Sequence, residues 1–369
     1  MSRIFGHTHR IGGLQFCACH LMPAKSAAPE GGGAAAPNKA SVMIKGRKAR
    51  VIDTHTHCLF QDSLDLMGAD APGILPPTKG MPDHFLQQAD PLKARLADMD
   101  KMGVDMQVLS VNPFWYKKDR DTAAAICKIN NESLAELIAQ HPRRFSAFAS
   151  IAMQYPDLAV EQLEEAVKKF GLVGAAIGGS VLGRDFAHPE FHPVLAKAQE
   201  LGVTLFIHPQ STPELAHRFK GNGWLANVIG NPLDTTIALE KLIFEGVLDK
   251  YPQLKVLAAH GGGFLGSYAP RMDRSCYISP QNCNPDIVLK KKPSEYMRQI
   301  YVDALVFTPE ALRHLAAEVG PGQIMVGTDH PIPWEMDPVG HIMSTPELSD
   351  DDRLNILGET AIRVLGVKP

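Results

Sequence analysis

Short apolar runs alternate along this chain with longer segments of helical periodicity. The runs occupy residues 50–53, 105–111, 145–151, 172–177, 204–207, 255–259, 299–304 and 323–326, and the clearest helical segments are 122–139, 158–169 and 233–248. Strands that are buried on both faces of a parallel sheet have continuous apolar sequences of this kind. Eight such strands, most of them followed by a helix, predict a (β/α)8 TIM barrel of the α/β class. An open doubly wound sheet is the alternative, because strand number does not show whether a sheet closes.

The first 48 residues differ from the rest in charge and complexity. They carry seven Lys and Arg side chains and one acid, Glu30, for a net charge of +6, so the other 321 residues carry −9 of the total of −3. Residues 30–37 consist of Glu, Gly, Ala and Pro only, which is typical of a flexible linker. We therefore predict one large barrel domain over 49–369 and a disordered basic tail before it. A cleaved secretory signal over 11–21 is the alternative for the tail.

Composition excludes several classes of protein. With 45% hydrophobic and 21% charged residues the chain can fill a core, and a pI near 6.6 argues against nucleic-acid binding by bulk charge. The sequence has no uninterrupted apolar run of about 18 residues, the length that spans a bilayer. Six cysteines are too few for a disulfide scaffold. We predict a cytoplasmic protein that binds neither nucleic acid nor membranes, with export as the alternative.

Histidine and aspartate stand where several of the predicted strands end. They are His55 and His57 after the first strand, His208 after the fifth, His260 after the sixth and Asp329 after the eighth. The carboxyl ends of barrel strands form the active-site face in enzymes of this fold. His55 and His57, two residues apart on a strand, point to the same side. Three imidazoles and one carboxylate suit Zn²⁺ or a similar divalent metal, Mn²⁺ included.

A glycine-rich segment follows the sixth strand. Residues 261–266, Gly-Gly-Gly-Phe-Leu-Gly, match the dinucleotide pattern G-x-G-x-x-G. The dinucleotide-binding fold also needs an acidic residue at the end of the next strand, about 20 residues after the glycines. Here that region, residues 277–286, is rich in Pro and Asn and has no strand pattern. We therefore predict no organic cofactor and interpret the glycines as allowing close approach beside His260.

The strand-end motifs together resemble the amidohydrolase superfamily. The similarity is to its decarboxylase branch, the family of 2-amino-3-carboxymuconate-6-semialdehyde decarboxylase, and it covers about residues 51–365. The motifs that carry it are His55-Thr-His57, His208-Pro209, Ala259-His-Gly-Gly-Gly263 and Gly327-Thr-Asp329-His-Pro331.

This resemblance implies the roles of the site residues. His55, His57, His208 and Asp329 would hold one Zn²⁺, and His260 would be the acid/base residue beside it. Arg271 would reach the active site of a neighbouring subunit and bind a substrate carboxylate there, which implies a homodimer. The end of the fourth strand, residues 174–180, contains no lysine that could bridge a second metal, so we expect a mononuclear site.

One departure from the family affects the substrate rather than the reaction. The family's muconate decarboxylase has a second substrate-binding arginine after the first strand, and residues 58–90 contain none here, although Lys79 is a candidate cation. A lysine does not reproduce a bidentate carboxylate clamp. Trp115, Trp334 and Phe206 are candidate walls for an unsaturated or aromatic substrate. His330 is a candidate to orient Asp329, with an ordinary loop histidine as the alternative.

The prediction is therefore a metal-dependent decarboxylase of a carboxylated unsaturated or aromatic small molecule, either aminocarboxymuconate-like or hydroxybenzoate-like. One alternative is a hydrolase or hydratase of the same superfamily, acting on a lactone, an amide or a C=C bond. A metal-binding barrel without catalysis is a second alternative.

Overall fold

A computed structural model describes residues 42–73, 91–210 and 212–368. Parallel strands fall into two hydrogen-bonded sets with the orders β3-β4-β5 and β11-β10-β9-β8-β7-β6. Their bounds are β3 Ile52–His57, β4 Met106–Ser110, β5 Phe145–Ala147, β6 Ala149–Ser150, β7 Gly174–Ile177, β8 Thr204–Ile207, β9 Lys255–Ala258, β10 Ile300–Asp303 and β11 Ile324–Met325. Each set contains strands from several of the predicted apolar runs.

Backbone hydrogen bonds join the two sets at both of their edges. β5 and β6 flank Phe148, whose NH donates to the Leu109 carbonyl at 2.9 Å, so they form one strand between β4 and β7. At the other edge the Thr54 NH donates to the Val326 carbonyl at 2.8 Å, and the His57 NH to the His330 carbonyl at 2.7 Å. The sheet therefore closes, which confirms the predicted TIM barrel and excludes the open doubly wound sheet.

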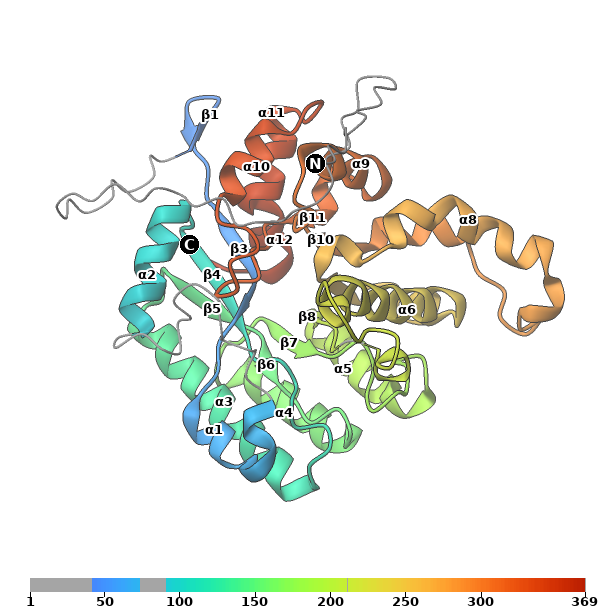
Figure 1. Ribbon diagram of the computed structural model, residues 1–369, viewed down its shortest axis with the longest axis horizontal. Helices are drawn as coiled ribbons and strands as arrows, with labels where there is room; N and C mark the ends of the chain where they lie inside the picture. The colour runs from blue at the N-terminus through green and yellow to red at the C-terminus, as the bar shows by residue number, and fades with distance from the viewer. Residues whose placement is uncertain (1–41, 74–90, 211, 369) are drawn as a thin grey trace, which may run out of the picture. The chain divides into compact units, whose positions relative to one another are not determined.

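Helices surround the strands, as Figure 1 shows. The α-helices are α1 Gln61–Asp65, α2 Pro91–Met102, α3 Arg120–Gln140, α4 Pro156–Lys168, α5 His192–Leu201, α6 Asn231–Phe244, α7 Val247–Lys250, α8 Leu265–Ile278, α9 Pro309–Val319, α10 Pro338–Ser344, α11 Asp350–Leu354 and α12 Thr360–Leu365. Shorter helical turns include η5 Ala226–Gly230, η6 His260–Gly262 and η8 Pro293–Gln299. The predicted helix over 233–248 is two helices, because Gly246 adopts a φ of 70° between α6 and α7.

Alternation along β8 positions one of the predicted metal ligands. Leu205 and Ile207 pack in the outer core between strands and helices, whereas Phe206 packs inside the barrel. Because successive strand residues face opposite sides, His208 follows Phe206 on the inner face. Phe206 stacks on Phe148 with ring centroids 5.2 Å apart, so these aromatic rings fill the barrel interior.

The last residues of the predicted tail belong to the folded domain. β1 (Met43–Ile44) and β2 (Arg47–Lys48) form an antiparallel hairpin around Lys45 and Gly46. Ile44 is buried, and Lys48 pairs with Asp105 at 3.1 Å. The prediction of disorder up to residue 48 is thus wrong for this hairpin, because its basic side chains pair with acids of the barrel. Residues 1–41 of the predicted tail lie outside the described residues.

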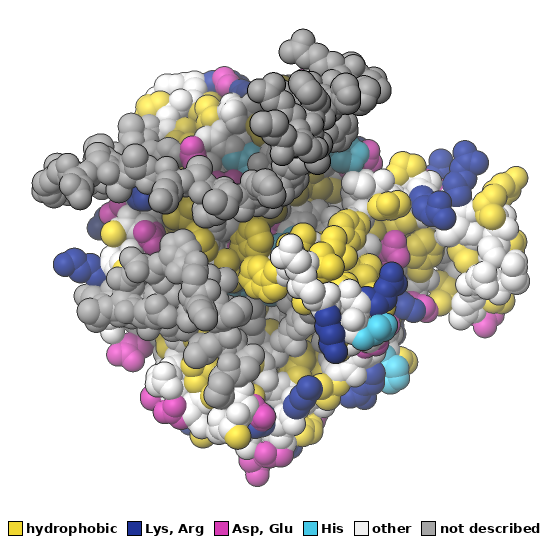
Figure 2. Space-filling model, in the orientation of Figure 1, with side chains coloured by type: hydrophobic (Ala, Val, Ile, Leu, Met, Phe, Trp, Pro, Cys, Tyr) yellow, Lys and Arg dark blue, Asp and Glu magenta, His cyan; other side chains and the backbone are white. Residues whose placement is uncertain are grey.

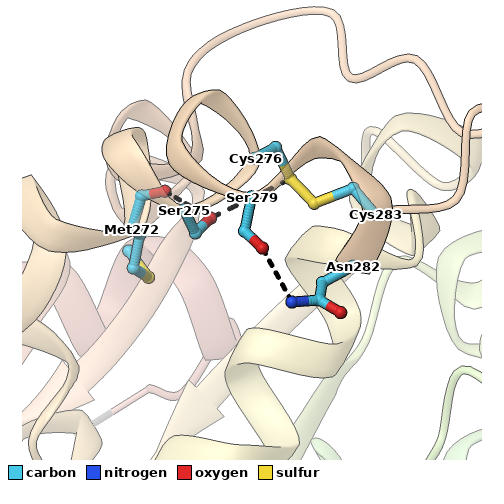
Figure 3. Close-up of a disulfide and its surroundings, with 6 residues drawn as sticks. All are labelled: Met272, Ser275, Cys276, Ser279, Asn282 and Cys283. Atoms are coloured by element: carbon cyan, nitrogen blue, oxygen red, sulfur yellow. Dashed lines mark hydrogen bonds between the residues drawn. A yellow bond between two sulfur atoms is a disulfide. The ribbon is translucent and has the colours of Figure 1, made fainter.

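α8 extends away from the strands beside α6 (Figure 1). A disulfide joins Cys276, near its end, to Cys283 in the following loop (Figure 3). Hydrophobic and basic side chains lie together over this region in Figure 2, and Tyr277 and Ile278 are exposed there. Among the helices of the described residues, none is long and apolar enough to cross a bilayer.

Candidate metal centre and catalytic site

Four of the predicted ligands converge at the carboxyl ends of the strands. His55, His57, His208 and Asp329 each offer a ligand atom, and these atoms lie within 4.8 Å of one another. The Nε2 atoms of His55 and His57 are 3.2 Å apart, and Asp329 Oδ1 lies 2.7 Å from Nε2 of His57. β3 changes register between Asp53 and Thr56, just where it presents the two histidines.

The hydrogen bonds of His55 and His57 engage both Nδ1 atoms and leave both Nε2 atoms facing Asp329. His55 Nδ1 lies 2.6 Å from Asp303 Oδ2, and a carboxylate only accepts, so the ring proton of His55 is on Nδ1. Ser110 Oγ donates its proton to the Thr56 carbonyl at 2.9 Å and can therefore only accept from His57 Nδ1, 3.2 Å away. The two Nε2 atoms thus face each other and Asp329 Oδ1, an arrangement that needs a positive charge, supplied either by a proton or by a bound cation.

His208 completes this donor set. Both of its ring nitrogens are buried and have no hydrogen-bond partner in the structure. A buried polar atom without a partner costs about 1–3 kcal/mol, so His208 needs a ligand. Three neutral imidazoles and a carboxylate fit a divalent cation of borderline softness. The four residues therefore form a divalent metal site, and they are the one such cluster found among the described residues.

The electrostatics show the same need for a positive charge at this place. Although burial lowers the pKa of His55, Asp329 and Asp303 more than offset it and raise that pKa to about 10, because without a cation the imidazole itself carries the positive charge. Burial raises the pKa of the Asp329 carboxyl, but His55 and His57 more than offset it and hold the pKa well below its usual value. Burial and the neighbouring imidazoles lower the pKa of His208 well below its usual value. Asp329 and His208 are therefore in the deprotonated form that binds a metal.

His260 lies beside the metal site on a strained turn. Its ring centroid is 5.1 Å from that of His55 and 5.5 Å from that of His208. Its φ is 57°, a left-handed conformation that is unfavourable for a residue with a side chain. Burial, followed by the charge of His55, lowers the pKa of His260 to about 4, so the imidazole is neutral at neutral pH.

The glycines after His260 serve packing, as the sequence predicts. Gly261, Gly262 and Gly263 all have positive φ. A Cβ on Gly263 would lie 2.2 Å from the Pro232 carbonyl oxygen and 2.5 Å from Thr236 Oγ1. The turn can therefore approach α6 closely only with glycine at this position.

Two adjoining pockets open beside these residues. One, of about 250 Å³, is lined by His57, His208 and Asp329, and the other, of about 180 Å³, is lined by His260. Asn227 lines both. Trp224 of the first and Trp334 of the second stack with ring centroids 5.8 Å apart and planes at 11°.

Not all of the proposed substrate-binding residues line these two pockets. Trp334 lines the second pocket, and its role in binding substrate stays a prediction. Trp115 is fully buried in the outer core, where its indole NH donates to the Ile151 carbonyl at 3.0 Å, so the prediction that it binds substrate is wrong. Phe114, one residue earlier, lines the first pocket instead. Lys79 lies outside the described residues.

Arg271 is not part of its own chain's site. It is exposed on α8, beside a separate cavity of about 680 Å³ that Arg274 and Cys276 also line. Within the described part of the chain it has no ion-pair or hydrogen-bond partner. Its predicted role in a neighbouring subunit's site therefore stays a prediction.

Phe206 and His330 do not occupy the positions expected for a pocket wall and for a residue that orients Asp329. Phe206 lies below the metal site, with its ring 5.3 Å from that of His55. His330 Nε2 pairs with Asp98 Oδ2 at 3.1 Å, so among the described residues it is bonded to α2 and not to Asp329.

Sequence reasoning assigned no role to several residues of the site. Asp303, at the end of β10, bonds to the ring of His55, and the rule that polar residues at strand ends mark the site could have found it. Trp224 and Asn227 come from an irregular segment between β8 and α6, where no periodic signal exists.

Comparison with known proteins agrees with the geometry. The amidohydrolase family model matches residues 52–367. A 2-amino-3-carboxymuconate-6-semialdehyde decarboxylase from Dictyostelium discoideum is 32% identical over 279 residues, which are 74% of this chain and 76% of that protein. A gamma-resorcylate decarboxylase from Polaromonas sp. is 28% identical over 305 residues, 78% of this chain and 90% of that protein.

Solved structures show the same similarity. A dihydroxybenzoic acid decarboxylase from Polaromonas sp., crystallised with manganese and the inhibitor 2-nitroresorcinol, has a TM-score of 0.75 and 26% identity over 86% of this chain and 97% of its own. A 2,6-dihydroxybenzoate decarboxylase in complex with 2,6-dihydroxybenzoate has a TM-score of 0.75 and 25% identity over 86% and 99%. The chain therefore belongs to the amidohydrolase family.

Proposed function

We propose that this protein is a metal-dependent decarboxylase of a small hydroxylated aromatic monocarboxylic acid. The observation that carries the proposal is the convergence of His55, His57, His208 and Asp329 beside His260 at the mouth of the barrel. Relatives named as decarboxylases of carboxymuconate and resorcylate substrates support the reaction type.

The metal we propose is Zn²⁺, with Mn²⁺ as the alternative because a structural relative contains manganese. A divalent cation held by these four residues supplies a positive charge that stabilises the negative charge left on the substrate when CO₂ departs. His55 and His57 would bind it through Nε2, because the Nδ1 atoms of both rings already have partners in Asp303 and Ser110.

His260 moves the proton that the reaction requires. Being neutral, it accepts a proton from water in the pocket, which leaves hydroxide, and then donates that proton to the ring carbon; the hydroxide is taken up by the departing CO₂ as bicarbonate. The bond from that carbon to the carboxylate breaks, its electron pair stays on the carbon, and the carbon takes the proton as CO₂ leaves. The pocket position of His260 supports this role, and burial lowers its pKa, which makes its protonated form a stronger proton donor to carbon.

Unpaired amides in the pocket support the substrate class. The side chains of Asn112, Asn227 and Asn231 line the first pocket and have no hydrogen-bond partner among the described residues. Such amides suit the hydroxyl groups of a substrate, and the stacked Trp224 and Trp334 suit a flat ring. Of the described residues of one chain that line the two pockets, none is a lysine or arginine, so the partner's Arg271, proposed below, would supply a clamp for one carboxylate and not for two.

A substrate panel tests the proposal against its main alternative, hydrolysis. Metal-loaded protein is incubated with hydroxybenzoates, with aminocarboxymuconate semialdehyde and with lactones, and CO₂ and products are measured. We expect CO₂ from an ortho-hydroxybenzoate such as 2,6-dihydroxybenzoate, and kcat/KM at least tenfold lower for the dicarboxylic muconate. Lactone opening without CO₂ release from any acid would show that the protein is a hydrolase.

We also propose a homodimer in which Arg271 completes the partner's site. Arg271 is unpaired on a helix that extends from the barrel, and Tyr268, Tyr277 and Ile278 on the same helix are exposed. The test mixes two inactive variants, His260→Asn and Arg271→Met, after reversible dissociation. If Arg271 acts across the interface, each hybrid dimer contains one intact site of two and regains up to about half of the wild-type activity per site. No recovery on mixing, or full activity of Arg271→Met alone, would contradict the proposed role of Arg271. Arg274→Met is the matched control.

The cytoplasmic location stays a proposal, and the disulfide gives a way to test it. Disulfides are rare in cytosolic proteins because cellular thiols reduce them. Cys276 and Cys283 can be alkylated in intact cells and examined by mass spectrometry. Free thiols support the cytoplasmic location, and a complete disulfide favours export.

A further inference from the structure

One buried carboxylate contacts both a metal ligand and the turn that carries His260. Asp303 is fully buried at the end of β10. Its Oδ2 accepts from His55 Nδ1 at 2.6 Å and from the His260 backbone NH at 2.8 Å. Its Oδ1 accepts from the backbone NH groups of Gly261 at 2.8 Å and Leu305 at 3.0 Å. The same side chain thus holds the ring of a metal ligand and the backbone of the proposed acid/base residue.

Only an ionised carboxylate satisfies this arrangement. Four donors surround two oxygen atoms, and each oxygen accepts two of them. An amide of the same shape has one acceptor oxygen, and its NH₂ group would face two donors. Charge-assisted bonds from a carboxylate are also about twice as strong as neutral ones.

The neighbouring strands leave room for this contact. A Cβ on Gly327 would lie 2.6 Å from Asp303 Cβ and 3.0 Å from His55 Cβ. Glycine after β11 therefore lets β10 and β3 bring Asp303 and His55 together.

We infer that Asp303 is a positioning residue that couples the metal ligand His55 to the turn that carries His260. It fixes the His55 ring so that Nε2 faces the metal, and it anchors the His260 backbone in its left-handed conformation. The first half of this inference stands on the metal site alone, and the second half rests on the proposed function of His260.

Metal binding without substrate tests the first half. Asp303→Asn is compared with wild type in a competition for Zn²⁺ against a chromophoric chelator. Loss of an outer partner of a metal-bound histidine weakens metal affinity by about 10–100-fold, and we expect a loss in this range. The matched control is Asp249→Asn, because Asp249 Oδ2 also accepts from a backbone NH, that of Lys290, and from a side chain, Tyr296, away from the site. Unchanged zinc affinity in folded Asp303→Asn would overturn the inference.

Kinetics at saturating metal test the second half. Because Asp303 also holds the His260 turn, we expect kcat of Asp303→Asn to stay at least tenfold below that of wild type when all sites contain metal. KM should differ from the wild-type value by less than threefold. Recovery of full kcat on metal saturation would show that Asp303 acts on the metal alone. If the protein proved not to be a decarboxylase, the zinc competition would still decide the first half.

A measurement on the wild-type protein keeps the inference falsifiable if Asp303→Asn does not fold. In zinc-loaded protein labelled with ¹⁵N-histidine, the His55 signal is identified by its loss in His55→Gln. We expect a protonated Nδ1 whose proton exchanges slowly with water. A protonated Nε2 on His55 would contradict the proposed positioning.

Discussion

His260 and Asp329 share an unusual backbone conformation. Their φ angles are 57° and 62°, and each such residue costs about 1–3 kcal/mol when it carries a side chain. Asp303 anchors the first of them, and the Asp329 NH donates to the His55 carbonyl at 2.9 Å. The barrel thus holds two strained residues at the place where the chemistry is proposed.

Removing the His260 imidazole should abolish turnover but not metal binding. We expect His260→Asn to lower kcat by about 10²–10⁴-fold, the contribution typical of a positioned acid/base group. Metal content per chain should equal that of wild type, because His260 is not among the four ligands. His192→Asn, on α5 and away from the site, is the control. Wild-type activity in His260→Asn would refute the proposed proton transfer.

Asp234 should make stability depend on pH. Burial raises the pKa of this carboxyl from 3.8 to about 6, although the Gln210 NH donates to it. Since the pKa in the folded state is the higher one, the ionised form penalises folding; the penalty is complete above pH 6 and vanishes below pH 3.8. Its upper limit is about 3 kcal/mol.

Asp234→Asn tests this dependence, because the amide can still accept from Gln210. We expect the variant to melt at a higher temperature than wild type at pH 8 and at the same temperature near pH 4. A variant that is less stable than wild type at pH 8 would show that ionised Asp234 does not penalise folding.

At the scale of elements, the approach of η6 to α6 depends on Gly263. Gly263→Ala places a Cβ against the Pro232 carbonyl and Thr236 and forces alanine to a φ of 70° and a ψ of −130°. Gly366, at a φ of 69° and a ψ of 18° in the left-handed region, has nothing within 4 Å of the corresponding position. Gly366→Ala should therefore cost only the conformational energy, about 1–2 kcal/mol. Gly263→Ala should cost at least about 2 kcal/mol more and reduce activity, because the His260 turn must move.

Urea denaturation of the two glycine variants measures the difference. Equal losses of unfolding free energy would show that the turn has room for a methyl group, contrary to the structure.

The sequence predicted regular elements well and irregular ones poorly. Apolar runs and helical periodicity found the strands and two of the three clearest helices, because burial enforces those patterns, whereas the break at Gly246 divided the third. Trp115 was misassigned because a loop has no period from which to tell that Phe114, and not Trp115, faces the pocket. The hairpin at residues 43–48 was missed because its charges are satisfied by residues far along the chain.

At the scale of the whole molecule, barrel closure creates the metal site. His55 and His57 come from the first strand of the barrel, and Asp329 from beyond the last. They meet only because β3 lies beside the segment after β11, as the bond from Thr54 to Val326 shows. The strand-end rule therefore predicted the metal ligands and could have found Asp303, but the stacking of Trp224 on Trp334 required the folded chain.

The most direct test of the proposed function is CO₂ release as a function of bound metal. The protein is stripped with a chelator, titrated with Zn²⁺ or Mn²⁺, and assayed with 2,6-dihydroxybenzoate, in parallel with His208→Ala. We predict that activity rises linearly to one metal per chain, and that His208→Ala binds metal at least tenfold more weakly and releases no CO₂ at that metal concentration. Full CO₂ release by the metal-free protein, or by His208→Ala without bound metal, would contradict the proposed mechanism.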